Sequence, residues 1–453
     1  MDQHSPSQTV LFPDLFEKPI VARFDTDLAS SDGGAILLHR KDQQLGLIRR
    51  LASVLTDARC SERSRFTAED ILRQRVLAIA CGYPDGNDAR TLRVDPIMKL
   101  CSDRSPALGG ALASQPTISR FENSVTRSEL AAMQAEMIEV VLRSCNRRYG
   151  RGVRRIVIDL DPTDDPTYGQ QQLSLFNRHY GCHCYLPMMG FVSFDGHAEQ
   201  HLVAALLRPG NAAGSLCAKE LLEALTRRLR ELFPKARIVA RLDGAFATPA
   251  LLDWLDRARR VDYVVNFAKN AVLTEMAEEM MATARAQSEA TGETARVFGE
   301  VFYQARSWPN ARRVVVKAEV TRYEGREPRD NPRFVVTNMR LSPKTVYRLY
   351  CGRGDCENRI KEMKIDLQSG RTSCTSFFAN QLRLTMTAMA FVLIQELRAD
   401  ATGTSWARAT VATIRSGLLK IGATVSESTR RIVLHLPKSF PQVEIFRRLA
   451  TVT

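Results

Sequence analysis

Several features that mark other protein classes are missing from this sequence of 453 residues. Its first residues, MDQHSPSQTVLFPDLF, lack the charged segment, apolar core and cleavage site of a secretion signal. The most apolar long run, Leu384 to Leu397, is interrupted by polar residues and is too short to span a bilayer. The sequence also has no G-x-x-x-x-G-K-[ST] phosphate loop, no serine or cysteine nucleophile motif and no internal repeat. We therefore predict a cytoplasmic protein with no membrane segment and no nucleotide requirement.

The cysteines do not indicate a disulfide framework or a zinc site. All ten are scattered, which in a reducing compartment favours buried thiols. His179, Cys182, His183 and Cys184 lie close together, but no second Cys or His pair follows at the spacing of a zinc finger. The favoured interpretation is that these side chains pack, and a metal at this cluster is the minor alternative.

Acidic residues are outnumbered along the chain. The 50 Asp and Glu residues face 64 Lys and Arg residues, which gives a net charge of +14. An excess of this kind favours a polyanionic partner, with nucleic acid ahead of a membrane surface. The length predicts two or three domains with a sizeable core.

Residues 1–150 are predicted to form a mainly helical region that binds DNA ends. The segment from Ser114 to Asn123 has the pattern of a capped helix that begins at a proline. Within it, Thr117 and Arg120 lie on a face that could read DNA as part of a helix-turn-helix. The alternative is a plain helical bundle.

The pattern changes at Gly150, where strand-like runs begin. Three strands, a helix, a strand, a helix and a strand follow in the segments 154–161, 185–194, 200–207, 213–233, 237–242, 248–259 and 263–267. An antiparallel meander followed by parallel crossovers is the plan of an RNase H-like α/β domain with a mixed sheet.

This plan predicts the remaining domain boundaries. Residues 151–269 are the first part of the catalytic domain, and residues 270–340 are an insertion that contains strands. Residues 341–398 complete the catalytic domain. Residues 399–453 carry eight Lys or Arg against three Asp or Glu, so we expect a helical, basic C-terminal region that contacts DNA or a second subunit.

Two aspartates follow strands that would be neighbours in such a sheet. Asp161 ends the first strand and Asp243 ends the fourth, and turn residues follow each of them. Carboxylates that converge at a sheet edge can hold the two metal ions of phosphoryl transfer, about 3.5–4 Å apart. Asp159 shares the face of Asp161 and is the alternative first ligand.

The segment YCGRGDCENRIKEMK, residues 350–364, contains the candidate third carboxylate. On one helix, Tyr350, Arg353, Glu357 and Lys364 would lie within an arc of roughly 60°, with Lys361 on the same side. That face suits a metal ion beside a phosphodiester. The alternatives are a salt-bridged surface helix and, because Gly352 and Gly354 weaken its first turn, a helix that starts later.

These residues resemble the signatures of insertion-sequence transposases of the DDE type. Tyr350-x2-Arg353-x3-Glu357-x6-Lys364 matches the Y-x2-R-x3-E-x6-K motif in full, and Asp161-Pro-Thr163 resembles the D-x-T motif. The segment from Arg241 to Phe246 resembles R-x-D-S-G-F, with Gly-Ala in place of Ser-Gly. The resemblance extends over residues 154–393 and implies an RNase H-like catalytic domain.

The resemblance also implies a function. Asp161, Asp243 and Glu357 would hold two Mg²⁺ ions, with Mn²⁺ able to substitute, and would cleave the terminal inverted repeats of an element and join them to target DNA. Arg353, Lys361 and Lys364 would face phosphates, and Tyr350 would hydrogen-bond or stack beside them. Such enzymes pair two double-stranded DNA ends, so a homodimer or larger assembly is expected.

Two further expectations complete the interpretation. Trp308, in the insertion, could stack on a flipped base, although a packed aromatic is the more common role of such a residue. Two other functions stay open: a metal-dependent DNA nuclease of the same fold without strand transfer, and a non-catalytic DNA-binding protein.

Overall fold

A computed structural model describes residues 10–12, 17, 20–22, 25–56 and 65–452. In this part of the chain a nine-stranded mixed sheet forms the centre, in the order β12-β13-β15-β11-β10-β4-β8-β9, with β14 (Arg329–Asp330) beside β13. The strands are β4 (Arg155–Pro162), β8 (Met188–Phe194), β9 (Gln200–Leu206), β10 (Arg237–Leu242), β11 (Val261–Phe267), β12 (Ala295–Tyr303), β13 (Arg312–Thr321) and β15 (Arg333–Thr337).

Five of these strands confirm the predicted RNase H-like arrangement. β4, β8 and β9 pair antiparallel in sequence order, whereas β10 and then β11 join the other side of β4 in parallel. Their β-branched and apolar side chains are buried on both faces, as expected for strands covered by helices on both sides. The first strand, β4, is thereby the neighbour of β10, the strand that precedes Asp243.

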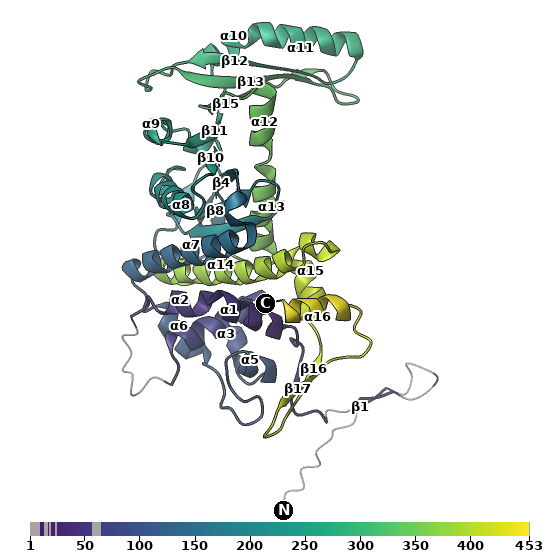
Figure 1. The fold of residues 1–453 in the computed structure, drawn as a ribbon. Coiled ribbons are helices and arrows are strands. Elements are labelled where there is room, and N and C mark those ends of the chain that lie inside the picture. The colour runs from purple at the N-terminus through teal and green to yellow at the C-terminus, as the bar shows by residue number, and fades with distance from the viewer. Residues whose placement is uncertain (1–9, 13–16, 18–19, 23–24, 57–64, 453) are drawn as a thin grey trace, which may run out of the picture.

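Two groups of helices cover the sheet. Valines of β4, β10, β11, β13 and β15 form an apolar cluster under α12 (Pro343–Cys351), which crosses one face. The opposite face contributes to the main core together with α8 (Ala218–Leu232) and α9 (Pro249–Arg257). α13 (Gly354–Ile365) continues from α12 along the sheet towards the long helix α14 (Phe377–Asp400), as Figure 1 shows.

The expected insertion is part of the same sheet. β15 pairs antiparallel with both β11 and β13, so residues 295–337 extend the catalytic sheet instead of forming a separate one. α10 (Ala271–Met276) precedes α11 (Glu278–Thr291), and α11 packs on β13 through Met281 and Ala284 against Ala318 and Val320. In Figure 1 this unit forms the end of the molecule farthest from the N-terminal helices.

The helix α14 lies between the sheet and the N-terminal helices (Figure 1). Among the described residues it is the helix that is long and apolar enough to cross a membrane by length and composition, but 78% of its most apolar stretch is buried inside the protein. It is therefore the core helix of this fold. The N-terminal layer comprises α1 (Ala35–Leu45), α2 (Leu47–Ala52), α3 (Ala68–Ala80), α4 (Ala89–Leu92), α5 (Pro96–Leu100) and α6 (Gln115–Glu122). The next helix, α7 (Arg127–Tyr149), lies beside α14 and packs on β9.

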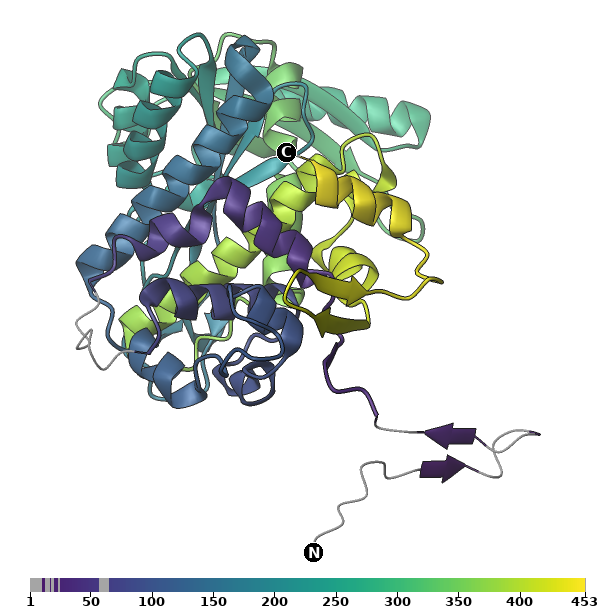
Figure 2. The ribbon, with the colours of Figure 1, turned by 60° about the horizontal axis from the view of Figure 1, so that its bottom comes forward.

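The C-terminal region folds beside the N-terminal layer (Figure 2). It contains α15 (Val411–Ile414) and α16 (Val443–Thr451), but also a hairpin of β16 (Ala423–Glu427) and β17 (Ile432–His435). The expectation of a helical region is thus only partly right. β16 pairs with β3 (Ala29–Ser30), so the two ends of the described chain share a small sheet. A separate short pair consists of β1 (Val10–Phe12) and β2 (Ile20–Ala22).

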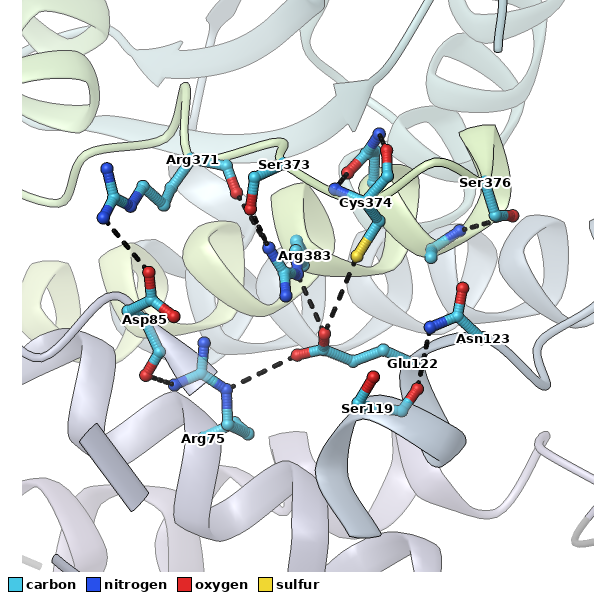
Figure 3. A network of polar contacts seen from close by, with 12 residues as sticks. Arg75, Asp85, Ser119, Glu122, Asn123, Arg371, Ser373, Cys374, Ser376 and Arg383 are labelled. Atoms are coloured by element: carbon cyan, nitrogen blue, oxygen red, sulfur yellow. Dashed lines mark hydrogen bonds and ion pairs between the residues drawn. The ribbon is translucent and has the colours of Figure 1, made fainter. Parts of the chain in front are cut away.

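A buried carboxylate connects the N-terminal layer to the segment between α13 and α14 (Figure 3). Glu122, at the end of α6, is 1% exposed. Arg383 of α14 donates from Nε to Glu122 at 2.8 Å, and the Arg75 guanidinium of α3 lies 3.6 Å away. The thiol of Cys374 lies 4.0 Å from the same carboxylate. This closed network fixes the N-terminal layer against the catalytic domain.

Candidate active site

The two aspartates lie side by side at one edge of the sheet. Asp161 is near the end of β4 and Asp243 directly follows β10. The parallel register pairs Leu160 with Leu242, so the next residue of each strand is an aspartate. The Asp243 carboxylate accepts a hydrogen bond from the Ala245 amide at 2.8 Å. The Gly-Ala sequence after Asp243 therefore still holds its carboxylate.

Arg353 joins all three predicted carboxylates. Its Nη2 atom lies 2.8 Å from Asp161 Oδ1 and 3.7 Å from Asp243 Oδ2, and its Nη1 atom lies 2.6 Å from Glu357 Oε1. Glu357 lies in the first turn of α13. The structure thus brings together three carboxylates from two strands and a helix, with one positive charge between them. The three carboxylates and the Arg353 guanidinium together carry a charge of −2 when all are ionised.

The three carboxylates differ in their contact with solvent. The Asp161 side chain is 9% exposed, that of Asp243 is 24% exposed and that of Glu357 is 57% exposed. Burial raises the pKa of Asp161 to about 6; Arg353 opposes this shift, whereas repulsion from Asp243 and Glu357 adds to it. Burial also raises the pKa of Asp243, again against the effect of Arg353. The fold therefore holds these charges at an energetic cost.

A cleft of about 360 Å³ opens beside this cluster. Asp161, Thr163, Glu357, Lys361 and Lys364 line it. The Lys364 ammonium donates to Asp164 Oδ1 at 2.7 Å and lies 3.4 Å from the Thr163 hydroxyl. Both lysines thus line the same cleft as Asp161 and Glu357.

The carboxylates suit a divalent metal ion by their chemistry. Magnesium prefers oxygen ligands, and this cluster offers three carboxyl groups with an excess of negative charge. Within the described ranges of the chain, no three Asp, Glu, His or Cys side chains already surround a metal-sized point. Arg353 occupies the space between the carboxylates instead. A metal ion at this position requires the guanidinium to move away.

Asp159, the alternative first ligand, has a different environment. It is 1% exposed and forms two hydrogen bonds with Arg241, at 2.6 and 2.8 Å. Arg241 also donates to the Leu349 carbonyl at 3.0 Å, which ties β10 to α12. Asp159 therefore holds the sheet and the helix together, and Asp161 is the aspartate that reaches the cleft. In the sequence, the arginine of the R-x-D motif, Arg241, is the feature that could have predicted this ion pair with Asp159.

The signature segment is divided between two helices. α12 ends at Cys351 and α13 begins at Gly354, so the expectation of one continuous helix from 350 to 364 is wrong. The alternative of a helix that starts later is right, because Tyr350 and Arg353 both precede α13. A side chain at position 352 would come within 2.3 Å of the Arg241 guanidinium, which explains the glycine at the break. Tyr350 lies on α12, half-buried against the valine cluster, and burial raises its pKa. It is not among the residues that line the cleft.

Trp308 is not placed to stack on DNA. The ring is 4% exposed and lies 5.1 Å from Phe267 and 5.7 Å from Tyr303, with the Arg312 guanidinium 4.6 Å above it. The chain between β12 and β13 turns the indole inward onto β11. Trp308 is therefore a core residue, and the expectation of base stacking is corrected.

The predicted DNA-reading residues lie on α6, a helix of eight residues. The Thr117 hydroxyl is 3.1 Å from the hydroxyl of Ser114, the residue that precedes the helix. Arg120 is exposed, whereas Glu122 on the same helix is buried in the network described above. Arg120 is thus accessible to a partner, and its contact with DNA stays a prediction.

The geometry agrees with a comparison to known families. Residues 12–452 match the family described as transposase DDE domain group 1. The chain belongs to this family. Nearly the whole described chain is covered, so the N-terminal layer, the catalytic domain and the C-terminal region are all parts of this DDE transposase family's architecture.

Curated protein sequences gave no match. Among solved structures, a piggyBac transposase, from a cryo-EM structure of its synaptic complex with hairpin DNA, is similar to this chain with a TM-score of 0.43 and 9% sequence identity. The similarity covers 85% of this chain and 80% of that chain.

Proposed function

We propose that this transposase cleaves DNA at the ends of its element and joins those ends to target DNA, with Asp161, Asp243 and Glu357 as the ligands of Mg²⁺. The observation that carries the proposal is the contact of one guanidinium with all three carboxylates. Bound divalent ions activate the attacking oxygen and stabilise the leaving oxygen of a phosphodiester. The full Y-x2-R-x3-E-x6-K motif supports membership of the signature group that bears its name.

Arg353 has two partners in turn under this proposal. In the metal-free protein it neutralises part of the charge of the three carboxylates. Once divalent ions take over that neutralisation, the guanidinium is free to pair with a phosphate, for which its planar fork of N–H donors is well suited. Arg353 thereby holds the three carboxylates together before the metal ions bind and then contacts the substrate.

The two lysines of α13 would contact phosphates of the DNA backbone. Lys361 is exposed and lines the cleft, and Lys364 is held at the cleft by Asp164. Ammonium groups there would bind phosphates on either side of the cleaved bond and fix its position. Tyr350, near the end of α12, would hydrogen-bond to the same strand through its phenol.

The partners follow from the charge and from the reaction. A net charge of +14 favours double-stranded DNA, in the form of the terminal inverted repeats and the target. Holding two ends for coordinated joining calls for a homodimer or a larger assembly. Mn²⁺ offers a similar preference for oxygen ligands and is expected to replace Mg²⁺.

The test is a cleavage and joining assay on the DNA that flanks the coding region. The wild-type protein should nick this DNA in Mg²⁺ but not in EDTA, and should yield joined products with a target plasmid. Glu357→Gln should abolish both reactions. Asp355→Asn is the matched control, because it removes a carboxylate from the same first turn of α13 without touching Arg353.

Each alternative function has its own outcome in this assay. A nuclease of the same fold would cut the DNA and give no joined product. A non-catalytic DNA-binding protein would retard the DNA in a gel and leave it intact in Mg²⁺. Equal cleavage by wild type and Glu357→Gln would remove Glu357 from the site.

A further inference from the structure

A small hairpin stands beside the carboxylate cluster. Between β4 and β8 the chain forms a three-stranded sheet of β5 (Asp165–Pro166), β7 (Cys182–Tyr185) and β6 (Leu175–Asn177). β5 begins four residues after Asp161, so this sheet grows directly out of the edge that carries the proposed active site. We call residues 168–183, which include β6 and the turn to β7, the aromatic hairpin.

The aromatic hairpin has a fixed backbone. The Asn177 side chain donates to the Gly210 carbonyl at 2.8 Å, and its own carbonyl accepts from the amides of His179 and Tyr180 in the turn. Gly181 closes this turn with a φ of 67°, which a residue with a side chain rarely adopts. The Gln172 amide donates to the Thr375 carbonyl at 3.0 Å, in the segment between α13 and α14. The hairpin is thus attached to the catalytic domain on two sides.

Its outer surface is unusually rich in exposed rings. Among the described residues, six Phe or Tyr side chains are strongly exposed, and three of them belong to this segment: Tyr168 at 96%, Phe176 at 53% and Tyr180 at 38%. Phe176 lies opposite His183 across the two strands, with ring centroids 5.5 Å apart. Tyr180 packs edge-on against His179 at 4.8 Å. Several solvent-exposed aromatic rings in one short segment indicate a binding surface.

The charges of the hairpin favour a nucleic acid. Residues 168–183 contain no Asp or Glu and include Arg178, His179 and His183. Arg178 and both histidines are exposed. Burial raises the pKa of Tyr180, and the charges of Asp164, Asp161 and Asp243 raise it further, so this phenol lies within electrostatic range of the carboxylates. A surface that combines rings with basic groups, at the border of a phosphodiester-cleaving site, fits nucleotides.

We propose that the aromatic hairpin stacks on unpaired bases of the DNA strand beside the bond that is cut. The inference rests on the proposed function, because the carboxylates define where that bond lies. Every base has a flat face, so stacking on Tyr180, Phe176 and Tyr168 needs no particular sequence. Arg178 would contact the phosphates between the stacked bases. With Trp308 buried, the hairpin supplies the exposed rings next to the site.

The experiment measures binding in EDTA, where no cleavage occurs, with two DNA probes. One is a blunt duplex of the flanking sequence, and the other carries a single-stranded extension at the predicted cut, with 2-aminopurine as its first unpaired base. The wild-type protein should bind the extended probe more tightly and quench its fluorescence. Tyr180→Ala and Phe176→Ala should weaken binding of the extended probe by about 5- to 100-fold and abolish the quenching.

The controls separate stacking from other effects. Tyr180→Phe keeps the ring and should behave as the wild type. Phe302→Ala removes an exposed ring from β12, in the unit at the far end of the sheet, and should change nothing. Tyr168→Ala alters a side chain that is almost fully exposed. Any loss of binding to the extended probe in this variant therefore cannot come from misfolding.

Two outcomes would overturn the proposal. One is equal binding of the extended probe by wild type and Tyr180→Ala; the other is an equal loss of binding to both probes. Formation of dimers that Phe176→Ala disrupts, without any change in DNA binding, would assign the surface to a second copy of the chain and would also overturn it. Because the assay needs no catalysis, a wild-type protein that does not quench the probe but still cleaves DNA in Mg²⁺ would refute the hairpin proposal alone. Quenching without any cleavage refutes the proposed function alone.

Discussion

Two ionic networks of this protein have opposite compositions. At the sheet edge, Arg353 lies among three carboxylates, and the outermost of them, Glu357, is more than half exposed. In the N-terminal layer, Glu122 lies between two arginines and is 1% exposed (Figure 3). The first network has surplus negative charge and opens into a cleft, whereas the second is closed.

The difference distinguishes a site that accepts ligands from one that holds the fold. A buried carboxylate between two guanidinium groups carries no surplus negative charge that would attract a cation, and removal of one partner mainly destabilises the protein. An open cluster with excess charge of one sign is costly to maintain, and a counter-ion relieves that cost. Carboxylates and arginines thus form a ligand-binding site in one network and a structural contact in the other. The difference lies in the ratio of carboxylates to arginines and in how far the carboxylates are exposed.

The largest expected effect is the loss of cleavage in Asp161→Asn. Replacement of a metal ligand removes several kcal/mol of transition-state stabilisation, so cleavage of flanking DNA should fall by about 1,000-fold or more. Single-turnover cleavage in Mg²⁺ provides the measurement. Asp159→Asn is not a suitable control, because it would break the buried pair with Arg241. Asp355→Asn serves instead, and a comparable loss in that control would contradict the assignment.

Glu122→Gln should break the closed network. Removal of its charge leaves Arg75 and Arg383 without their anion in a buried position, and such a change costs about 3–5 kcal/mol. Urea unfolding followed by circular dichroism would measure it, with the exposed Glu275→Gln as control. A change below about 1 kcal/mol would show that the network does not fix the N-terminal layer.

Asp161→Asn should stabilise the metal-free protein at neutral pH. The folded state raises the pKa of Asp161 from its usual value to about 6, so it binds this proton more tightly than the unfolded state does. The wild type therefore loses this contribution to its stability as the pH rises from about 4 to about 6, whereas the variant, which lacks the carboxyl group, has no such contribution to lose. The difference should be near zero at pH 4 and reach about 2–3 kcal/mol above pH 6.5.

Urea unfolding at a series of pH values in EDTA would test this prediction. The Asp355→Asn control should follow the wild type through the whole range. A variant that is less stable than the wild type at pH 7 would mean that Asp161 holds the fold, as Glu122 does. The comparison between the two networks would then fail.

The smallest effect is expected for Arg353→Lys. Lysine retains the positive charge but cannot contact Asp161 and Glu357 through two separate nitrogens of a planar fork. Cleavage should fall by about 10- to 100-fold, the range typical for residues that orient metal ligands. Arg348→Lys on the exposed side of α12 should have no effect. Unchanged cleavage in Arg353→Lys would restrict Arg353 to a charge-balancing role.

Much of the catalytic half could be predicted from the sequence. Strand period, turn residues and helix spacing are local properties, so the order of β4, β8, β9, β10 and β11 followed from them. The proximity of Asp161 to Asp243 then followed from the fold, because neighbouring parallel strands end at one edge.

Other features depend on contacts between distant segments. The need for glycine at position 352, in the break between α12 and α13, comes from Arg241, which lies more than one hundred residues earlier in the chain. Trp308 is buried by Phe267 and Tyr303, which the local sequence around it cannot reveal. The pairing of β15 with β11 also joins distant segments, so the insertion was not recognised as an extension of the sheet.

The central claim is that Asp161, Asp243 and Glu357 bind one group of metal ions. Fe²⁺ bound in place of Mg²⁺, with ascorbate and peroxide, cuts the nearby polypeptide backbone and so reports the position of the metal. The claim predicts cuts near residues 161, 243 and 357, competed by Mg²⁺, lost in Asp161→Asn and retained in Asp355→Asn. Cuts at other positions, or the same cuts in Asp161→Asn, would contradict it.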